Sequence, residues 1–252
     1  MKKLIAILLS LGMVAVLVVG CKGTNPDTPN TSVTESTVDE SKEDPADSSK
    51  VDEPEVQVVN VADYINNKDA WENDGGDVAF EEGKITFSNC FSGDFAAIRL
   101  KEPVQNVTYK FNVQVNEIGQ VSMDDGTWWD CELLIMARSS LAASSWYDDG
   151  SQTGYTLTSW GDLSTVFIGR AGYDDAFGEY EWNINDGNKH AIELTVTNNQ
   201  DNTVVTVTLV VDGKEIASVT DDGTLIKKER PGLYPDAGGL TIRCKYLAAV
   251  VD

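Results

Sequence analysis

Histidine, cysteine and basic residues are the scarce side chains of this sequence of 252 residues. It contains one histidine, His190, and four cysteines. Zinc is disfavoured, because Cys90, Cys131 and Cys244 are far apart in the chain and only one histidine could join them. A Ser-His-Asp mechanism would have to use His190, which opens a predicted strand and serves no nucleophile-elbow motif. We therefore expect His190 to be a structural strand residue.

Positively charged residues are also few. The chain has 19 Lys and Arg against 41 Asp and Glu, a formal net charge of -22. A surface of this sign repels phosphate backbones, which argues against nucleic acid as a partner. It also argues against an electrostatic contact with anionic lipids.

Long apolar runs are absent except at the start of the chain. Two lysines precede an apolar run over residues 4–19, and Gly20 stands directly before Cys21. This order is that of a secretory signal. Residues 18–21 resemble the lipobox of bacterial lipoproteins, which implies that Cys21 is lipidated and anchors the chain outside the cytoplasm at the bacterial cell membrane. The alternative is a retained transmembrane segment. We expect a signal peptide over residues 1–21 and membrane contact through the lipid anchor only.

Aromatic residues are absent from residues 22–56, which are rich in Ser, Thr, Pro, Asp and Glu. Such a segment cannot bury enough apolar surface to offset its chain entropy. The composition predicts a disordered acidic linker, followed by one folded domain over residues 57–252.

Helical periodicity is rare in this domain, whereas short runs rich in Val, Ile, Thr and aromatic residues are frequent. Predicted strands lie at residues 84–88, 95–100, 107–115, 154–160, 165–170, 190–196, 203–211, 214–220 and 238–246. The run "CELLIMAR" at 131–138 is nearly continuous, which indicates a strand buried on both faces. Asp212 and Gly213 form the clearest two-residue hairpin loop. Short helices are expected only near Val61 and near Leu141. About ten to twelve strands without parallel crossovers predict one all-β sandwich or barrel.

The C-terminal third resembles a known family. The strings "HAIELTV", "TVTLVVDGKEIASVTD" and "GGLTIRCKYLAAVVD" resemble the closing strands of concanavalin A-like lectin/glucanase domains, including laminin-G-like modules. The resemblance implies an antiparallel jelly-roll β-sandwich of two curved sheets, with carbohydrate on the concave face or at loops on one edge. Some members of that family are glycosidases and many are binding modules.

The cysteine state stays open. With Cys21 lipidated, one disulfide plus one thiol and three buried thiols are both compatible with the remaining three cysteines. The family resemblance implies a pairing of Cys90 with Cys244 if the first and last strands are neighbours.

A catalytic carboxylate motif is also missing. The resemblance to laminarinase-like enzymes would imply Glu-x-Asp-x-x-Glu on one strand, and no string matches it. The nearest string, "ENDGGD" at residues 72–77, is expected to be a glycine-rich loop. The string "EYE" at residues 179–181 places two carboxylates on one face but lacks the third.

Tryptophan supplies the best indication of function. Trp128 stands beside an Asp-Gly turn, and Trp146, Tyr147 and Asp148 lie in the stretch "SSWYDDGSQTGY". Aromatic rings stack on the apolar faces of sugars, and carboxylates accept hydrogen bonds from their hydroxyl groups. These four residues are therefore predicted to bind carbohydrate.

Two arginines extend this predicted site. Arg138 and Arg170 could donate to hydroxyl groups or to an acidic sugar. Trp129, Trp160 and Trp182 are more simply interpreted as core or sheet-face residues.

A structural calcium ion is possible at the Asp doublets 124/125, 148/149, 174/175 and 221/222, although Asp-Gly turns explain most of them without metal. No other cofactor is expected. The sequence thus predicts a cell-surface lipoprotein whose β-sandwich binds polysaccharide without catalysis. A glycoside hydrolase or lyase on the same fold, and a structural or protein-adhesion module, are the alternatives.

Overall fold

The computed structural model describes residues 54–88, 95–119, 121–122, 128–129, 131–140, 153–171, 176–224 and 237–252; for 121–122 and 128–129 it describes the backbone alone. All of them belong to one compact unit, Lys50–Asp252.

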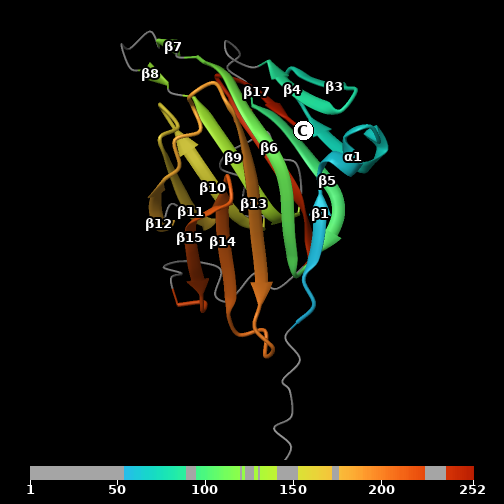
Figure 1. Ribbon diagram of the computed structural model, residues 1–252, viewed down its shortest axis with the longest axis vertical. Helices are drawn as coiled ribbons and strands as arrows, with labels where there is room; N and C mark the ends of the chain where they lie inside the picture. The colour runs from blue at the N-terminus through green and yellow to red at the C-terminus, as the bar shows by residue number, and fades with distance from the viewer. Residues whose placement is uncertain are drawn as a thin grey trace, which may run out of the picture. The chain divides into compact units, whose positions relative to one another are not determined.

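Most of this part of the chain is in β-strands, and its helices are short (Figure 1). Its elements are β1 (Gln57–Asn60), α1 (Ala62–Ile65), a 3-10 turn (Lys68–Ala70), β2 (Trp71–Asp74), β3 (Val78–Glu81), β4 (Lys84–Ser88), β5 (Ala96–Val104), β6 (Val107–Ile118), β7 (Val121–Ser122), β8 (Trp128–Trp129), β9 (Glu132–Ser139), β10 (Tyr155–Trp160), β11 (Thr165–Arg170), β12 (Ala176–Glu181), β13 (Lys189–Asn198), β14 (Val205–Val211), β15 (Lys214–Asp221), β16 (Gly238–Lys245) and β17 (Leu247–Val251). None of the helices in these ranges is long and apolar enough to cross a membrane.

Two sheets make up the fold. The eight-stranded sheet has the order β15-β14-β13-β6-β17-β4-β3, with β1 paired to β6, and the seven-stranded sheet has the order β12-β11-β10-β9-β16-β5-β2. Strands β7 and β8 form a separate pair. These sheets confirm the expected antiparallel β-sandwich.

One pair departs from the expected antiparallel pattern. Strand β1 runs parallel to the first residues of β6, Val107 to Lys110. Strand β17 covers only the later part of β6, from Val113 to Ile118. The edge of β6 is therefore open at its start, and β1 fills it.

The core lies between the sheets, because alternate side chains of each strand point inward. In β6 the buried residues alternate with partly exposed ones, and the inward side chains of both sheets join one apolar cluster. Ile85 and Val113 enter it from one sheet, and Leu133 and Ile242 enter it from the other. Each such side chain stabilises the fold by about 1.5 to 3 kcal/mol.

Several local predictions are confirmed. Strand β9 is buried along its whole length, as the continuous run "CELLIMAR" indicated. Asp212 and Gly213 have φ angles of 52° and 76°, the left-handed backbone that a two-residue hairpin loop of this kind requires. The helix expected near Val61 is α1. The helix expected near Leu141 lies outside the described residues.

The prediction for residues 72–77 is wrong in its first half. Glu72 and Asp74 belong to β2, which pairs with β5, because Trp71 points into the core and draws this segment onto the sheet edge. Gly75 and Gly76, with φ angles of 75° and 77°, then end the strand.

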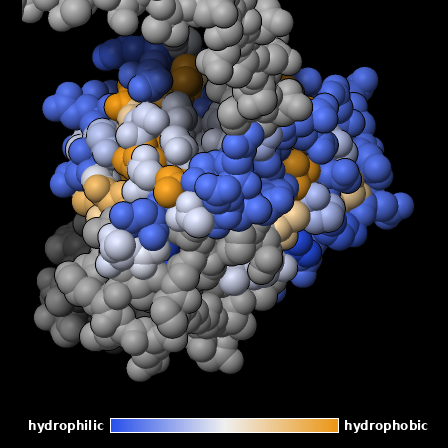
Figure 2. Space-filling model, turned by 90° about the horizontal axis from the view of Figure 1, so that it is seen from below, coloured by the Kyte–Doolittle hydropathy of each residue, from blue (hydrophilic) through white to orange (hydrophobic). Residues whose placement is uncertain are grey.

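Among the described residues visible in Figure 2, most are hydrophilic, and the hydrophobic ones form small spots between them. Among the described residues, the large hydrophobic side chains that are exposed are Val56, Val58 and Trp160. Single exposed valines are ordinary. An exposed indole on a sheet face is less common than an exposed valine, and Trp160 belongs to the candidate site described below.

Candidate functional site

The outer face of the seven-stranded sheet carries buried polar side chains. Leu133 and Ile135 of β9 point into the core, so the alternate residues of this strand point outward. Charged residues are rarely buried without a partner or a function. Six polar residues on this outer face are buried: Glu132, Thr156, Thr158, Thr241, Arg243 and Lys245.

Strand register places three of the side chains in one row. Lys245 of β16 lies opposite Glu132 of β9, and Glu132 lies opposite Trp160 of β10. Neighbouring strands are about 4.8 Å apart. A base, an acid and an indole therefore stand side by side across three adjacent strands.

Glu132 and Arg243 form the central ion pair of this face. Arg243 donates from Nη2 to Glu132 Oε1 at 2.8 Å, and from Nε to the same oxygen at 3.2 Å. Burial raises the pKa of Glu132, although the charge of Arg243 opposes the shift. Burial likewise lowers the pKa of Arg243. A pair that has lost its water in this way is costly to keep charged.

A phenyl ring holds two cations beside this pair. The guanidinium carbon of Arg243 lies 4.4 Å from the centroid of the Phe95 ring, and Lys245 Nζ lies 4.5 Å from it. Both distances are within the range of cation–π attraction. Phe95 thus fixes the charged ends of two neighbouring outward residues of β16.

Trp160 forms the exposed side of the site. Its residue is 43% exposed, and its ring packs on Phe167 with centroids 4.8 Å apart. A hydrogen bond between the Trp160 and Glu132 side chains lowers the pKa of Glu132, against the larger effect of burial. The indole is held in place on one side and is open to solvent on the other.

A second ion pair borders the site on the β5 side. Arg99 donates from Nε to Glu72 Oε2 at 2.8 Å, and the two side chains are 17% and 41% exposed. Since Arg99 lies opposite Thr241 of β16, this pair and the Glu132–Arg243 pair belong to one continuous face.

The arrangement is suited to binding a hydrogen-bonding ligand with apolar faces. Trp160 offers an exposed ring for stacking, and the partly exposed Arg99 and Glu72 offer a planar donor and an acceptor. Glu132 and Arg243 are buried beside the indole. Among the described residues, no three His, Cys, Asp or Glu side chains are grouped closely enough to hold a metal ion. The calcium site therefore stays a prediction, with three of its four Asp doublets outside the described residues.

The two carboxylates of the ion pairs are poorly placed for glycoside hydrolysis. Glu72 on β2 and Glu132 on β9 are three strands apart in the sheet, or about 14 Å between strand axes. The two carboxylates of a glycosidase stand about 5 to 9.5 Å apart. Each of these two is also bound to an arginine.

The residues predicted to bind carbohydrate are only partly within the described structure. Trp146, Tyr147 and Asp148 lie outside it, and of Trp128 only the backbone, in β8, is described. Their assignment stays a prediction.

Arg138 and Arg170 lie in the interior of the sandwich. Arg170 donates from Nε to Asp221 Oδ2 at 2.6 Å, and the hydroxyl of Tyr155 donates to the same oxygen at 2.9 Å. Arg138 lies over the Tyr155 ring and donates to the carbonyl oxygen of Gln105. Burial lowers the pKa of Arg138 to about 10. The structure thus brings both arginines together around Tyr155, with protein groups as their described partners.

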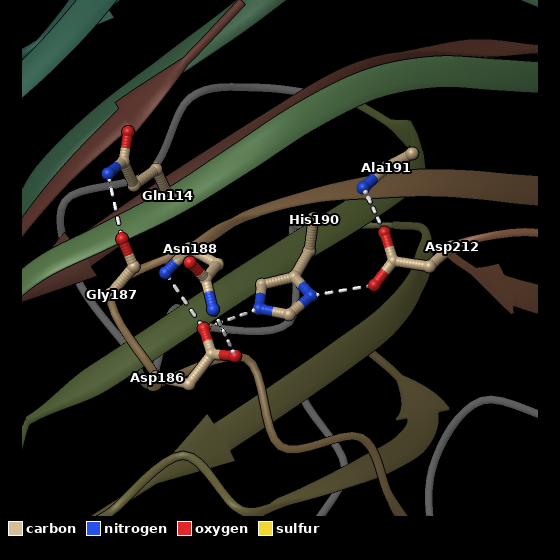
Figure 3. A network of polar contacts seen from close by, with 7 residues as sticks. All are labelled: Gln114, Asp186, Gly187, Asn188, His190, Ala191 and Asp212. Atoms are coloured by element: carbon tan, nitrogen blue, oxygen red, sulfur yellow. Dashed lines mark hydrogen bonds and ion pairs between the residues drawn. The ribbon is translucent and has the colours of Figure 1, made fainter.

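His190 occupies a strand position, as expected, and lies between two aspartates (Figure 3). Its Nδ1 is 2.8 Å from Asp212 and its Nε2 is 2.9 Å from Asp186. Burial lowers the pKa of His190, but its hydrogen bonds with Asp212 and Asp186 outweigh this effect and raise it overall. Hydrogen bonds from Asn188, with a further one from His190, lower the pKa of Asp186 to about 2. The network ties the turn before β13 to the β14–β15 hairpin.

Sequence reasoning missed Glu132, Arg243 and Lys245 and interpreted Trp160 as core or sheet face. Trp160 is a sheet-face residue, and it is exposed. Trp182, in contrast, is buried in the core. The available signal was the polar residue every second position in "TIRCKY", which marks Thr241, Arg243 and Lys245 as one face of a strand.

Comparisons with known proteins return solved structures. No protein-family model matches the chain, and no curated protein does. The carbohydrate-binding module CBM66 from Bacillus subtilis matches with a TM-score of 0.49 and 14% identity, over 73% of this chain and 92% of that one. The Crh5 transglycosylase in complex with NAG matches with a TM-score of 0.48 and 13% identity, over 75% and 66%. Peanut lectin matches with a TM-score of 0.41 and 14% identity, over 73% and 92%. These neighbours include a lectin and a carbohydrate-binding module. Likeness at this level assigns no residue of this chain to a ligand.

Proposed function

We propose that this chain is a cell-surface lipoprotein whose β-sandwich binds carbohydrate without catalysis, at the outer face of the seven-stranded sheet. Lipidated Cys21 would hold the domain at the membrane, and residues 22–56 would act as its spacer. The observation that carries the proposal is the Trp160 ring, exposed on one side and bonded to a buried ion pair on the other.

The physical reason lies in the mixed surface of a sugar. Its C–H faces stack on an aromatic plane, and its hydroxyl groups need donors and acceptors at the ring's edge. Trp160 and Phe167 supply the apolar plane. Thr158 on the same strand, Glu132 on the neighbouring strand β9 and Arg243 on β16, one strand further away, are the polar groups on this side of the indole. An aromatic contact of this kind contributes about 0.5 to 1.5 kcal/mol beyond area burial.

A glycan-array screen of the full chain, purified in mild detergent, tests the proposal. Trp160→Ala should weaken binding about tenfold, since a lost contact of about 1.4 kcal/mol changes an equilibrium constant by that factor. Val58→Ala removes another exposed hydrophobic side chain, 54% exposed against 43% for Trp160, from the other sheet, and this variant should bind as the original chain does.

The same screen decides the position of the site. Trp128→Ala and Trp146→Ala belong in it, with and without chelator, because these residues and calcium remain predictions from sequence. Loss of binding in Trp146→Ala but not in Trp160→Ala would keep the carbohydrate role and move the site to that loop. No binding to any glycan would leave a structural or adhesion module as the better account.

A hydrolase or lyase is the second candidate, favoured by one feature. Burial raises the pKa of Glu132, as a general acid requires. Incubating a bound glycan with the chain and assaying for new chain ends tests this. Cleavage that Glu132→Gln abolishes without loss of binding would establish an enzyme.

A further inference from the structure

The basic residues of this domain are unevenly placed. Residues 57–252 hold 31 acidic and 14 basic residues. Strands β5 and β16 are neighbours in the seven-stranded sheet, and their outward positions hold four of the basic residues. We call these four the cationic stripe: Arg99 and Lys101 on β5, Arg243 and Lys245 on β16.

The stripe is continuous across the two strands. Arg99 lies opposite Thr241, and Arg243 lies opposite Ala97, so Arg99 and Arg243 are diagonal neighbours. Lys101 and Lys245 continue the stripe along their own strands, in opposite directions. Arg243 and Lys245 converge on the Phe95 ring. Like charges placed so close on one sheet face repel and reduce stability.

Carboxylates flank the stripe. Glu72 on β2 binds Arg99, and Glu132 on β9 binds Arg243. Within β5 and β16 themselves the acidic residue is Glu102. In a domain with twice as many acids as bases, two adjacent strands with four bases and one acid form a local reversal of charge.

One end of the stripe reaches solvent. Lys101 is exposed, and the Arg99 side chain is 17% exposed. Arg243 and Lys245 are buried and fix the inner end, which adjoins Glu132 and Trp160 through the strand register. Trp160 therefore lies at the Lys245 end of the stripe and Lys101 at the opposite end, so a ligand that contacts both must be a chain of several sugars.

We infer that the ligand of this face is an anionic polysaccharide, whose carboxylate or sulfate groups bind the solvent-exposed end of the cationic stripe, Lys101 and Arg99, while a sugar ring stacks on Trp160. This inference rests on the proposed carbohydrate binding and names the class of ligand. Guanidinium groups bind planar or tetrahedral oxyanions through paired N–H donors.

Because the protein has a large negative net charge, retention on a polyanion is a specific test of this inference. A chain of charge -22 is repelled by polyanions as a whole. Retention on a polyanion therefore requires a local group of cations.

The test is retention of the full chain, in mild detergent, on beads that carry polygalacturonate, dextran sulfate or uncharged dextran, together with a panel of neutral glycans. The first two beads separate carboxylate from sulfate as the recognised group. Lys101→Gln should raise the dissociation constant for the preferred polyanion roughly fivefold, as expected for one partly exposed ionic contact. It should also reduce the dependence of binding on salt.

Lys110→Gln is the matched control. Lys110 is a lysine of the eight-stranded sheet, 41% exposed in its side chain and paired with Glu193, and its loss should leave retention unchanged. Equal effects of the two substitutions would overturn the stripe as the site. Binding to neutral glycans alone would overturn the inference and leave the proposed function standing. No retention on any bead or glycan would overturn both.

Discussion

At the residue scale, one titratable side chain, His190, connects two turns through hydrogen bonds from both of its ring nitrogens. Its Nδ1 contacts Asp212 and its Nε2 contacts Asp186. The backbone N–H of Ala191 also donates a hydrogen bond to Asp212. Gln114 donates to the carbonyl oxygen of Gly187 in the same turn, as Figure 3 shows. Both carboxylates stabilise the protonated imidazole and raise the pKa of His190 against the effect of burial. Hydrogen bonds from Asn188, with a further one from His190, lower the pKa of Asp186.

This network predicts a pH-dependent stability. A histidine with a folded pKa above its unfolded value of about 6.5 stabilises the fold fully below pH 6.5. That contribution is lost as the pH rises through the folded pKa. Comparison of urea midpoints for the original chain and His190→Gln should therefore show a larger difference at pH 5.5 than at pH 8.5. An equal difference at the two pH values would contradict the doubly bonded imidazolium.

At the scale of elements, register decides which side chains meet. Strands β10 and β11 belong to the seven-stranded sheet and β15 belongs to the other. Asp221 at the end of β15 is fully buried and receives hydrogen bonds from Tyr155 of β10 and Arg170 of β11. This contact, the Asp221 clamp, joins the two sheets through a charged pair.

Removal of one charge from the Asp221 clamp should be strongly destabilising. Asp221→Asn leaves Arg170 buried without its counter-charge, a change that costs about 3 to 5 kcal/mol. Urea unfolding monitored by tryptophan fluorescence measures it. Asp222→Asn is the control, because Asp222 is exposed and accepts hydrogen bonds from Thr224. A loss below 1 kcal/mol in Asp221→Asn would show that the clamp contributes little to holding the sheets together.

At the scale of the whole molecule, the proposed role combines an anchor, a spacer and an anionic sandwich. The excess of acidic residues keeps such a domain soluble and apart from anionic lipids. Two or more acyl chains on Cys21 would each contribute about 0.8 kcal/mol per buried methylene, which suffices for lasting attachment. The domain would then present its sheet face to polysaccharide outside the cell.

The anchor makes a separate prediction. Cys21→Ser should move the chain from the detergent-extracted membrane fraction of a bacterial host to the aqueous fraction or leave the signal uncleaved, as judged by fractionation and intact mass. Ser10→Ala, within the apolar run, should leave the distribution unchanged. Acyl mass on the Cys21→Ser chain would refute Cys21 as the modified residue.

The strands β4 to β6, β9 to β11 and β13 to β16, the Asp212-Gly213 hairpin, the buried run of β9 and the β-sandwich follow from the sequence, because residue alternation and turn chemistry are local. The short strands β1, β2 and β3 were not predicted. The site did not follow, for reasons that lie in pairing. Glu132, Arg243, Lys245 and Trp160 are distant in sequence, and only the order β10-β9-β16 makes them neighbours. From the sequence, Arg138 and Arg170 could be recognised as possible hydrogen-bond donors to a ligand. Their burial around Tyr155 depends on the direction in which the end of each strand turns, as the left-handed φ of 55° at Arg138 shows. Local pattern determined the elements, and the tertiary packing of strands far apart in the chain decided which polar groups share a face.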